Sequence, residues 1–183
     1  ALPIFATAPL LWLFVMRDYQ KQRVLTLLSP EDDKFGAGWN IIQSTTAIGS
    51  GGLSGKGWTE GTQSQLNFLP ESHTDFIIAV LAEEFGLLGV LGLCALYLLL
   101  IGYCMIIAIN AQSQFARLMA GSISLTFFIY MFVNMSMVSG LLPVVGVPLP
   151  LISYGGSAIV TLFFGFGILM AISSEPKRIG TWR

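Results

Sequence analysis

Charged side chains are scarce in this sequence, which sets the first limit on what the protein can be. The 183 residues include 9 Lys and Arg and 10 Asp and Glu, while 54% of the residues are hydrophobic. Soluble domains carry roughly 25% charged residues, so the composition argues against a soluble globular protein. The formal net charge of −1 provides no basic surface, and we expect no nucleic-acid partner.

Histidine and cysteine are also rare, which limits metal and disulfide chemistry. His73 is the single histidine, and one histidine without neighbouring cysteines falls short of a zinc site. Cys94 and Cys104 share one apolar stretch. On a helix they would be about 15 Å apart, beyond the roughly 7 Å that a disulfide allows. We expect both cysteines to face lipid or to pack against other helices.

A secretory signal peptide is not predicted either. Such a segment has a basic start and a small-residue cleavage site, whereas Ala1 already belongs to a hydrophobic stretch. The stretch 2–16 is shorter than the roughly 20 residues that cross a bilayer. We expect a transmembrane helix over 1–16 that is truncated at its start, and hence a chain that is a fragment of a longer protein.

Long hydrophobic runs are what the sequence has in quantity. Residues 85–109 contain no charged side chain, which is typical of a membrane-spanning helix. The full span is predicted over 75–109. Further spans are predicted over 115–138, where Asn134 is available for interhelical hydrogen bonds, and over 154–173. The predicted fold class is all-α, a polytopic transmembrane helical protein.

The span over 75–109 is longer than a bilayer requires. Extended back to Thr74 it would measure about 50 Å, against a hydrocarbon core of roughly 30 Å, so one end should project or tilt. Glu83 and Glu84 would lie at the water boundary, where a carboxylate within reach of apolar surroundings needs a partner. We expect them to snorkel, or to pair with Lys or Arg from the missing part of the protein.

Residues 17–74 form a polar segment of mixed charge between the first two spans. Short amphipathic helices are predicted over 19–28 and 39–48. The basic residues of the tail, 174–183, favour a cytoplasmic C-terminus. Counting crossings back from this tail makes the segment 17–74 and the proline-rich loop 139–153 extracytoplasmic.

Two irregular segments are candidates for function. Residues 49–57 are rich in glycine, but a Walker motif would need glycine at Ser50 and a hydroxyl residue at Gly57. The segment is either a flexible surface turn or a set of amides that, with Lys56, meets an anionic headgroup. Residues 139–153 contain three prolines and cannot form regular helix, and irregular backbone at membrane depth usually lines a cavity.

Asp75 is the leading candidate for chemistry, because it lies at the start of a long hydrophobic run. No serine spacing supports a nucleophilic triad with His73. Two interpretations remain open. Thr74 or Asp75 caps a helix, or the pKa of Asp75 is raised at the membrane boundary and its carboxylate acts as a general base.

Two long segments stand out by their dense motifs, GTQSQLNFLPESHTDFIIAVLAEEFG (61–86) and PVVGVPLPLISYGGS (143–157). Both resemble signature segments of the SEDS family of cell-wall proteins. The first resembles the RodA branch of the family more than the FtsW branch, although Ile78 stands where RodA relatives more often have phenylalanine. The resemblance implies the last four helices of a ten-helix fold, with a large extracellular loop between the first two of them.

The resemblance also implies an activity. Family members are peptidoglycan glycosyltransferases that polymerise lipid II outside the bacterial cytoplasmic membrane, beside a class B penicillin-binding protein and other elongation-complex proteins. The family's essential aspartate falls on Asp75, the expected general base on the acceptor sugar hydroxyl, with release of undecaprenyl pyrophosphate. A divalent cation, Mg²⁺ or Mn²⁺, is a candidate to neutralise the pyrophosphate. Candidate substrate-binding residues are Lys56, Gln63, Gln65, Glu71, His73, Thr74, Ser153, Tyr154, Gly155, Gly156 and Ser157.

Two other functions remain open on sequence grounds. A transporter could use the polar loops to move a lipid-linked precursor across the bilayer. A non-catalytic scaffold could use the amphipathic helices as docking faces within a cell-wall synthesis complex. An acidic side chain at a membrane interface fits each of the three functions.

Overall fold

The computed structural model describes residues 16–32, 36–61 and 74–175. Within these ranges the chain is helical and has no β-strand, as the sequence predicts. In chain order the elements are α2 (Asp18–Leu28), the short 3-10 helix η2 (Pro30–Asp32), α3 (Ala37–Gly51), α5 (Ile77–Asn110), α6 (Gln114–Val138) and α7 (Gly156–Ser173). The helix predicted over 1–16, apart from Met16, and most of the tail lie outside the described residues.

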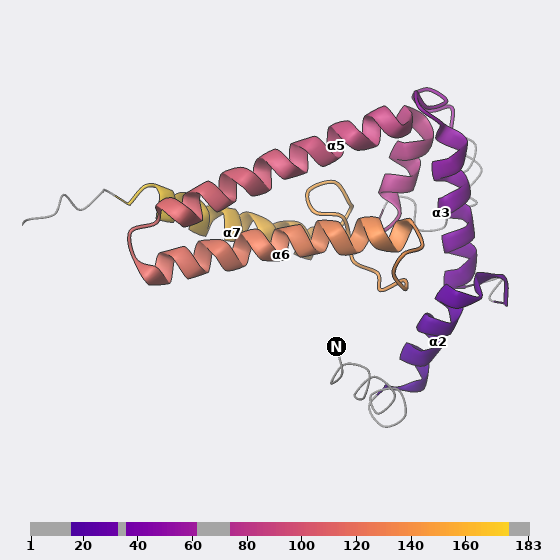
Figure 1. Cartoon of the computed structure of the whole chain (residues 1–183), viewed down its shortest axis with the longest axis horizontal. Coiled ribbons are helices and arrows are strands. Elements are labelled where there is room, and N and C mark those ends of the chain that lie inside the picture. Colours follow the sequence, from indigo (N-terminus) through magenta and orange to yellow (C-terminus); the bar gives the residue numbers. More distant parts are fainter. Residues whose placement is uncertain (1–15, 33–35, 62–73, 176–183) are drawn as a thin grey trace, which may run out of the picture.

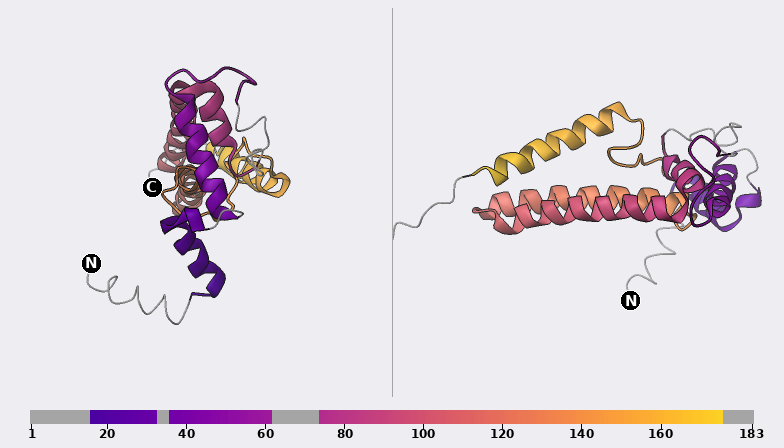
Figure 2. Two further views of the ribbon diagram at one scale, coloured as in Figure 1. Left: turned by 90° about the vertical axis from the view of Figure 1, so that its right-hand side faces the viewer. Right: turned by 90° about the horizontal axis from the view of Figure 1, so that it is seen from above.

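Among the residues that the structure describes, three helices are compatible with a membrane. α5, α6 and α7 are each long and apolar enough to cross a membrane. α5 and α6 form an antiparallel hairpin that α7 joins (Figures 1 and 2). The turn of the hairpin is short, because α5 ends at Asn110 and Ser113 caps α6 by accepting a 3.0 Å hydrogen bond from a first-turn N–H. Ring contacts among Tyr97, Phe127 and Phe166 connect the three helices.

α2 and α3 lie at the end of the hairpin opposite this turn, and α3 runs across that end (Figure 1). Both amphipathic helices predicted from the sequence are therefore present, and α3 extends a few residues beyond the predicted range at each end. The hydroxyl of Ser44 is fully buried and donates a 3.0 Å hydrogen bond to the carbonyl of Val138, the last residue of α6. The polar segment is thus fastened to the end of a membrane span.

The helix predicted to project from the bilayer breaks instead. Gly86, within α5, has φ 67° and ψ −163°, far from helical values, and α5 changes direction beside the C-terminal end of α3 (Figure 1). The part after the break, residues 87–110, measures about 36 Å at about 1.5 Å per residue, close to the thickness of a hydrocarbon core. The expectation of one uninterrupted helix is therefore wrong, while the projection or tilt of one end relative to a bilayer stays a prediction.

The break would leave carbonyl groups at the end of the first half-helix without partners. The loop after α3 supplies these partners. Backbone N–H groups of Lys56 and Gly57 donate to the carbonyls of Glu83 and Glu84, at 3.0 and 3.1 Å. These two amides are therefore engaged in the fold, which corrects the hypothesis that they meet an anionic headgroup.

The second half-helix has the opposite need, because its first N–H groups lack partners. The same loop meets it. Leu87 N and Leu88 N donate to the carbonyls of Gly52 and Leu53, at 3.0 and 3.2 Å. Residues 52–57, which we call the splint, thus provide hydrogen-bond partners for the backbone groups on both sides of the break.

Glycine is required where the splint approaches the helix. A Cβ at Gly51 would lie 1.9 Å from the carbonyl oxygen of Ala82, and one at Gly55 would lie 2.0 Å from that of Glu84. Gly86 combines a positive φ with a Cβ position 2.3 Å from Gly55 N. The glycine-rich composition therefore serves close backbone contact, which neither interpretation of the sequence anticipated.

Replacement of Gly86 by alanine is expected to destabilise the protein by at least about 2 kcal/mol, because the side chain adds backbone strain and a clash with the splint. Thermal unfolding of the full-length protein in detergent, followed by tryptophan fluorescence, measures the loss. Gly92→Ala is the control, since Gly92 lies in α5 with no atom within 4 Å of an added Cβ. Equal melting temperatures for the two variants would contradict the splint.

Candidate functional site

Asp75 lies in a turn immediately before α5, at the end of the hairpin where α3 and the proline-rich loop also lie. The neighbouring Phe76 is completely buried and anchors the turn in the core. The side chain of Asp75 is half-buried, and burial raises the pKa of this carboxyl above its ordinary value. The cause of this shift is desolvation, which favours the protonated form.

The turn is held by two side chains from elsewhere in the chain. The side-chain amide of Asn134 on α6 donates to the carbonyl of Asp75 at 2.8 Å and to that of Val147 at 2.7 Å. The hydroxyl of Ser153 donates to the carbonyl of Thr74. Carbonyls that fall just outside α5 are thereby satisfied, and the turn is tied to both α6 and the proline-rich loop.

The proline-rich loop is irregular, as the sequence predicts, and protein groups satisfy its carbonyls. Arg23 of α2 donates to Val144 O at 2.8 Å and to Val145 O at 3.2 Å. The buried hydroxyl of Tyr97 on α5 donates to Pro150 O. The loop is therefore fixed from two helices that lie far apart in the sequence.

Gly146 brings the loop directly against the candidate carboxylate. It has φ 81°, and a Cβ added there would lie 3.2 Å from Oδ2 of Asp75. Backbone rather than side chain therefore walls this side of the carboxylate. Only glycine adopts this conformation readily.

A cavity of about 680 Å³ lies between α6, α7 and the proline-rich loop. Its lining is mainly apolar, with hydroxyl groups at intervals, and it includes Gly146 and Ser153 beside the Asp75 turn. The hydroxyl-bearing residues that line it are Ser122, Thr126, Tyr130, Ser153, Ser157 and Thr161. The candidate carboxylate thus lies next to a largely hydrophobic groove.

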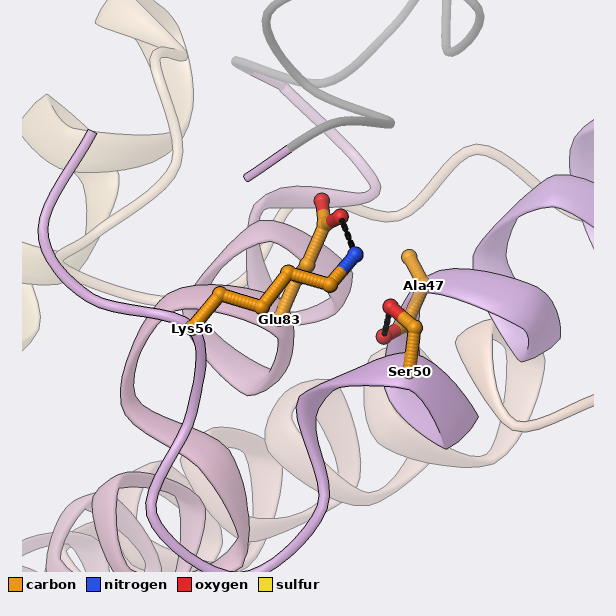
Figure 3. A network of polar contacts seen from close by, with 4 residues as sticks. All are labelled: Ala47, Ser50, Lys56 and Glu83. Carbon is orange, nitrogen blue, oxygen red and sulfur yellow. Dashed lines mark hydrogen bonds and ion pairs between the residues drawn. The ribbon is translucent and has the colours of Figure 1, made fainter. Parts of the chain in front are cut away.

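Lys56 and Glu83 form an ion pair of 2.7 Å beside the helix break, between the loop 52–57 and the first half of α5 (Figure 3). The Glu83 side chain is 0% exposed, and that of Lys56 is 29% exposed. Glu83 therefore pairs within this chain, which corrects the expectation of a partner from the missing part of the protein. Ser50 of α3 lies beside the pair, with its hydroxyl bonded to Ala47 O at 2.9 Å. Substrate binding by Lys56 stays a prediction.

The structure brings together only part of the site predicted from the sequence. The Ser153 hydroxyl donates to the carbonyl of Thr74, the residue before Asp75, while Lys56 lies beside the helix break. Ser153 is 3% exposed and its oxygen also accepts from Leu149 N, so its hydroxyl is used within the fold.

The residues after Ser153, at the start of α7, are Tyr154, Gly155, Gly156 and Ser157, of which Tyr154 is 84% exposed. Gln63, Gln65, Glu71 and His73 lie outside the described residues.

Two residues of the site were not predicted from the sequence. Asn134 was expected to bond another helix, and it bonds two loop carbonyls instead. Gly146 was one glycine among 20. The signal that could have identified Asn134 is its position as a lone amide within an apolar span, where a polar group needs a specific partner. No local sequence feature distinguished Gly146.

Together, the spans and the carboxylate site define a polytopic α-helical membrane protein. Residues 1–178 match the family described as Cell cycle protein (FtsW, RodA and SpoVE). The chain belongs to this family, the SEDS proteins, which confirms the resemblance found in the sequence.

Curated relatives are similar over nearly the whole chain. The peptidoglycan glycosyltransferase MrdB of Escherichia coli K12 is 62% identical over 176 residues, which cover 96% of this chain and 48% of MrdB. A probable peptidoglycan glycosyltransferase FtsW of Geobacter metallireducens is 44% identical over 175 residues, covering 95% of this chain and 46% of that protein. The chain thus spans about half the length of the curated relatives it matches.

Solved structures share the arrangement of helices. One, described as "Structural coordination of polymerization and crosslinking by a peptidoglycan synthase complex", superposes with a TM-score of 0.75 at 29% identity, covering 97% of this chain and 49% of that chain. The RodA of Thermus thermophilus, as a point mutant, gives a TM-score of 0.54 at 23% identity, covering 87% and 58%. This second match supports the fold alone.

The Lys56–Glu83 pair yields a prediction on stability. Lys56→Met removes the cation that faces the buried Glu83 carboxylate and is expected to cost on the order of 3 kcal/mol. The double variant Lys56→Met, Glu83→Met should recover most of this loss, because no charge then remains buried. Melting temperatures of the full-length variants test this, with exposed Arg117→Gln on α6 as the neutral control. A double variant less stable than Lys56→Met would contradict the pairing.

Proposed function

We propose that the full-length protein is a peptidoglycan glycosyltransferase that polymerises lipid II, with Asp75 as its general base. The observation that carries the proposal is the half-buried carboxylate with a raised pKa, held beside a largely apolar cavity. The names of the curated relatives support the reaction class. Because the chain spans about half of those relatives, the remaining helices would contribute further groups.

In this reaction a hydroxyl oxygen of the acceptor sugar attacks the anomeric carbon of the donor. The bond from that carbon to the lipid pyrophosphate breaks, and the pyrophosphate leaves with the electron pair. Asp75 accepts the proton of the attacking hydroxyl, a contribution of about 10²–10⁴-fold in typical enzymes. A raised pKa brings the base closer to the operating pH and makes it a stronger proton acceptor. A direct displacement of this kind inverts the anomeric centre.

The proposed location is the bacterial cytoplasmic membrane, with Asp75 on the outer side. The Asp75 turn and the α5–α6 turn lie at opposite ends of the hairpin (Figure 2), so one faces outward if the other faces the cytoplasm. Lipid-linked sugars present their headgroups at the membrane surface, where a carboxylate preceding a span can meet them. The apolar groove is suited to prenyl chains.

A protein partner is proposed from the similarity to a solved structure. The solved neighbour is described as a peptidoglycan synthase complex that coordinates polymerization and crosslinking. We therefore propose a class B penicillin-binding protein as the partner that crosslinks the strands, within the complex that elongates the cell.

The leaving pyrophosphate needs positive charge. The part of the chain that the structure describes contains no group of three His, Cys, Asp or Glu side chains that could hold a metal ion, and Mg²⁺ often uses only one or two carboxylates together with substrate phosphates. Mg²⁺ or Mn²⁺ stays a proposal, as do substrate contacts by Lys56, Thr74 and the Tyr154–Ser157 segment. Titration of chelator-treated protein with either cation tests the first of these.

Asp75→Asn should abolish polymerisation, because the amide cannot accept the hydroxyl proton; we expect a loss of at least about 100-fold. The assay uses the full-length protein with its partner and lipid II as the sole substrate, read out as glycan chain length. Asp18→Asn, an exposed acid at the start of α2, is the control. Wild-type protein that flips lipid II in vesicles but never polymerises it would instead support a transporter, and a silent Asp75→Asn variant would support a scaffold.

Because the pKa of Asp75 is raised, a rise in pH should increase the activity of the protein but decrease the contribution of this carboxyl to its stability. Activity requires the deprotonated carboxylate, so the acid limb of the pH–rate profile should fall at a pH above the ordinary carboxyl pKa of 3.8. A carboxyl whose pKa is raised on folding binds protons more tightly in the folded state, so its contribution to stability decreases as pH rises. Asp75→Asn should therefore raise the melting temperature at pH 7, and a lower one would contradict the raised pKa.

A further inference from the structure

Asn134 is a costly residue at its position in the fold. It lies on α6, completely buried, and its Oδ1 accepts no hydrogen bond from the described residues. An unsatisfied buried polar atom destabilises a fold, so stability alone does not favour asparagine here. Both hydrogens of the side-chain amide are used, on the carbonyls of Asp75 and Val147.

The two acceptors of Asn134 belong to the two sides of the candidate site. One is the carbonyl of Asp75 itself. The other belongs to Val147, the residue after Gly146, whose backbone lies against the Asp75 carboxylate. Because both acceptors are carbonyls, the amide nitrogen must face them. A single planar group therefore fixes the carboxylate's own backbone relative to the wall beside it.

Resting on the proposed function, we propose that Asn134 is a positioning residue that sets the place of the Asp75 carboxylate against Gly146 for proton transfer. It acts through the backbone of Asp75 and touches no reacting atom. The Ser153 hydroxyl supports the same turn one residue earlier, at the carbonyl of Thr74.

The turn needs this support because it lies outside regular helix. α5 begins at Ile77, so helix hydrogen bonds do not hold the Thr74 and Asp75 carbonyls at these positions. Without the donors, both carbonyls would seek water, and the carboxylate would move away from Gly146 into solvent. A displacement of about 1 Å costs on the order of 100-fold in rate for a positioned catalytic group.

The experiment compares Asn134→Ala with the wild type in the full-length protein, using lipid II and the partner transpeptidase. We expect kcat to fall roughly 10- to 100-fold, while KM for lipid II stays within about threefold. The acid limb of the pH–rate profile should move to lower pH, because a more solvated Asp75 has a pKa nearer its ordinary value.

Two further variants test the geometry independently of Asn134. Ser153→Ala removes the donor to Thr74 and should shift the acid limb in the same direction by a smaller amount. Gly146→Ala places a methyl group 3.2 Å from Oδ2, which excludes water from the carboxylate and should move the acid limb to higher pH. Shifts of the same sign for Asn134→Ala and Gly146→Ala would overturn the proposal.

Ser44→Ala is the matched control, because Ser44 is equally buried and also bonds a backbone carbonyl, that of Val138. It should lower the melting temperature without moving the pH profile. If Asn134→Ala changes only stability, as this control does, then Asn134 is structural and the positioning proposal fails while the proposed function stands. If the wild type itself does not polymerise lipid II, the proposed function fails and the positioning proposal fails with it.

Discussion

Backbone groups that lie outside regular helix must find hydrogen-bond partners wherever water is scarce, and at one end of this helical bundle that requirement shapes the structure. α5 is broken at Gly86, the Asp75 turn precedes α5, and the proline-rich loop cannot be helical. Each of these irregular segments exposes carbonyls or amides. Each is satisfied by a group from a distant part of the chain, so the irregular segments and the helices hold one another in place.

The hydrogen-bond partners of these irregular segments are backbone groups in one place and side chains in the other. At the helix break they are backbone groups of the splint, which can approach only because Gly51 and Gly55 lack side chains. At the Asp75 turn they are side chains, Asn134 and Ser153. The first half of α5 connects these two places, with the Lys56–Glu83 pair at one end and Asp75 at the other. The segment that carries the carboxylate is thus short and anchored at both of its ends.

Asp75 could be chosen as the candidate residue from the sequence, because it stands at the start of a hydrophobic run and within a signature segment, whereas Asn134 and Gly146 beside it could not. The break at Gly86 could not be predicted, since a glycine in an apolar helix usually continues it, and only the approach of Gly55 explains its positive φ. The ion-pair partner of Glu83 could not be predicted from the sequence either. Lys56 lies 27 residues away, and nothing in the sequence relates the two.

The sequence by itself determined the fold class, the family and the approximate places of the three apolar helices that the structure describes, because hydropathy over long windows and dense local motifs depend only on residue order. Tertiary structure alone decided which groups meet at the site. Asn134, Gly146 and Asp75 come from α6, a loop and a turn, and their contact depends on how half-helices pack and where unsatisfied carbonyls face. Such contacts are set by backbone geometry in three dimensions, and no spacing along the chain encodes them.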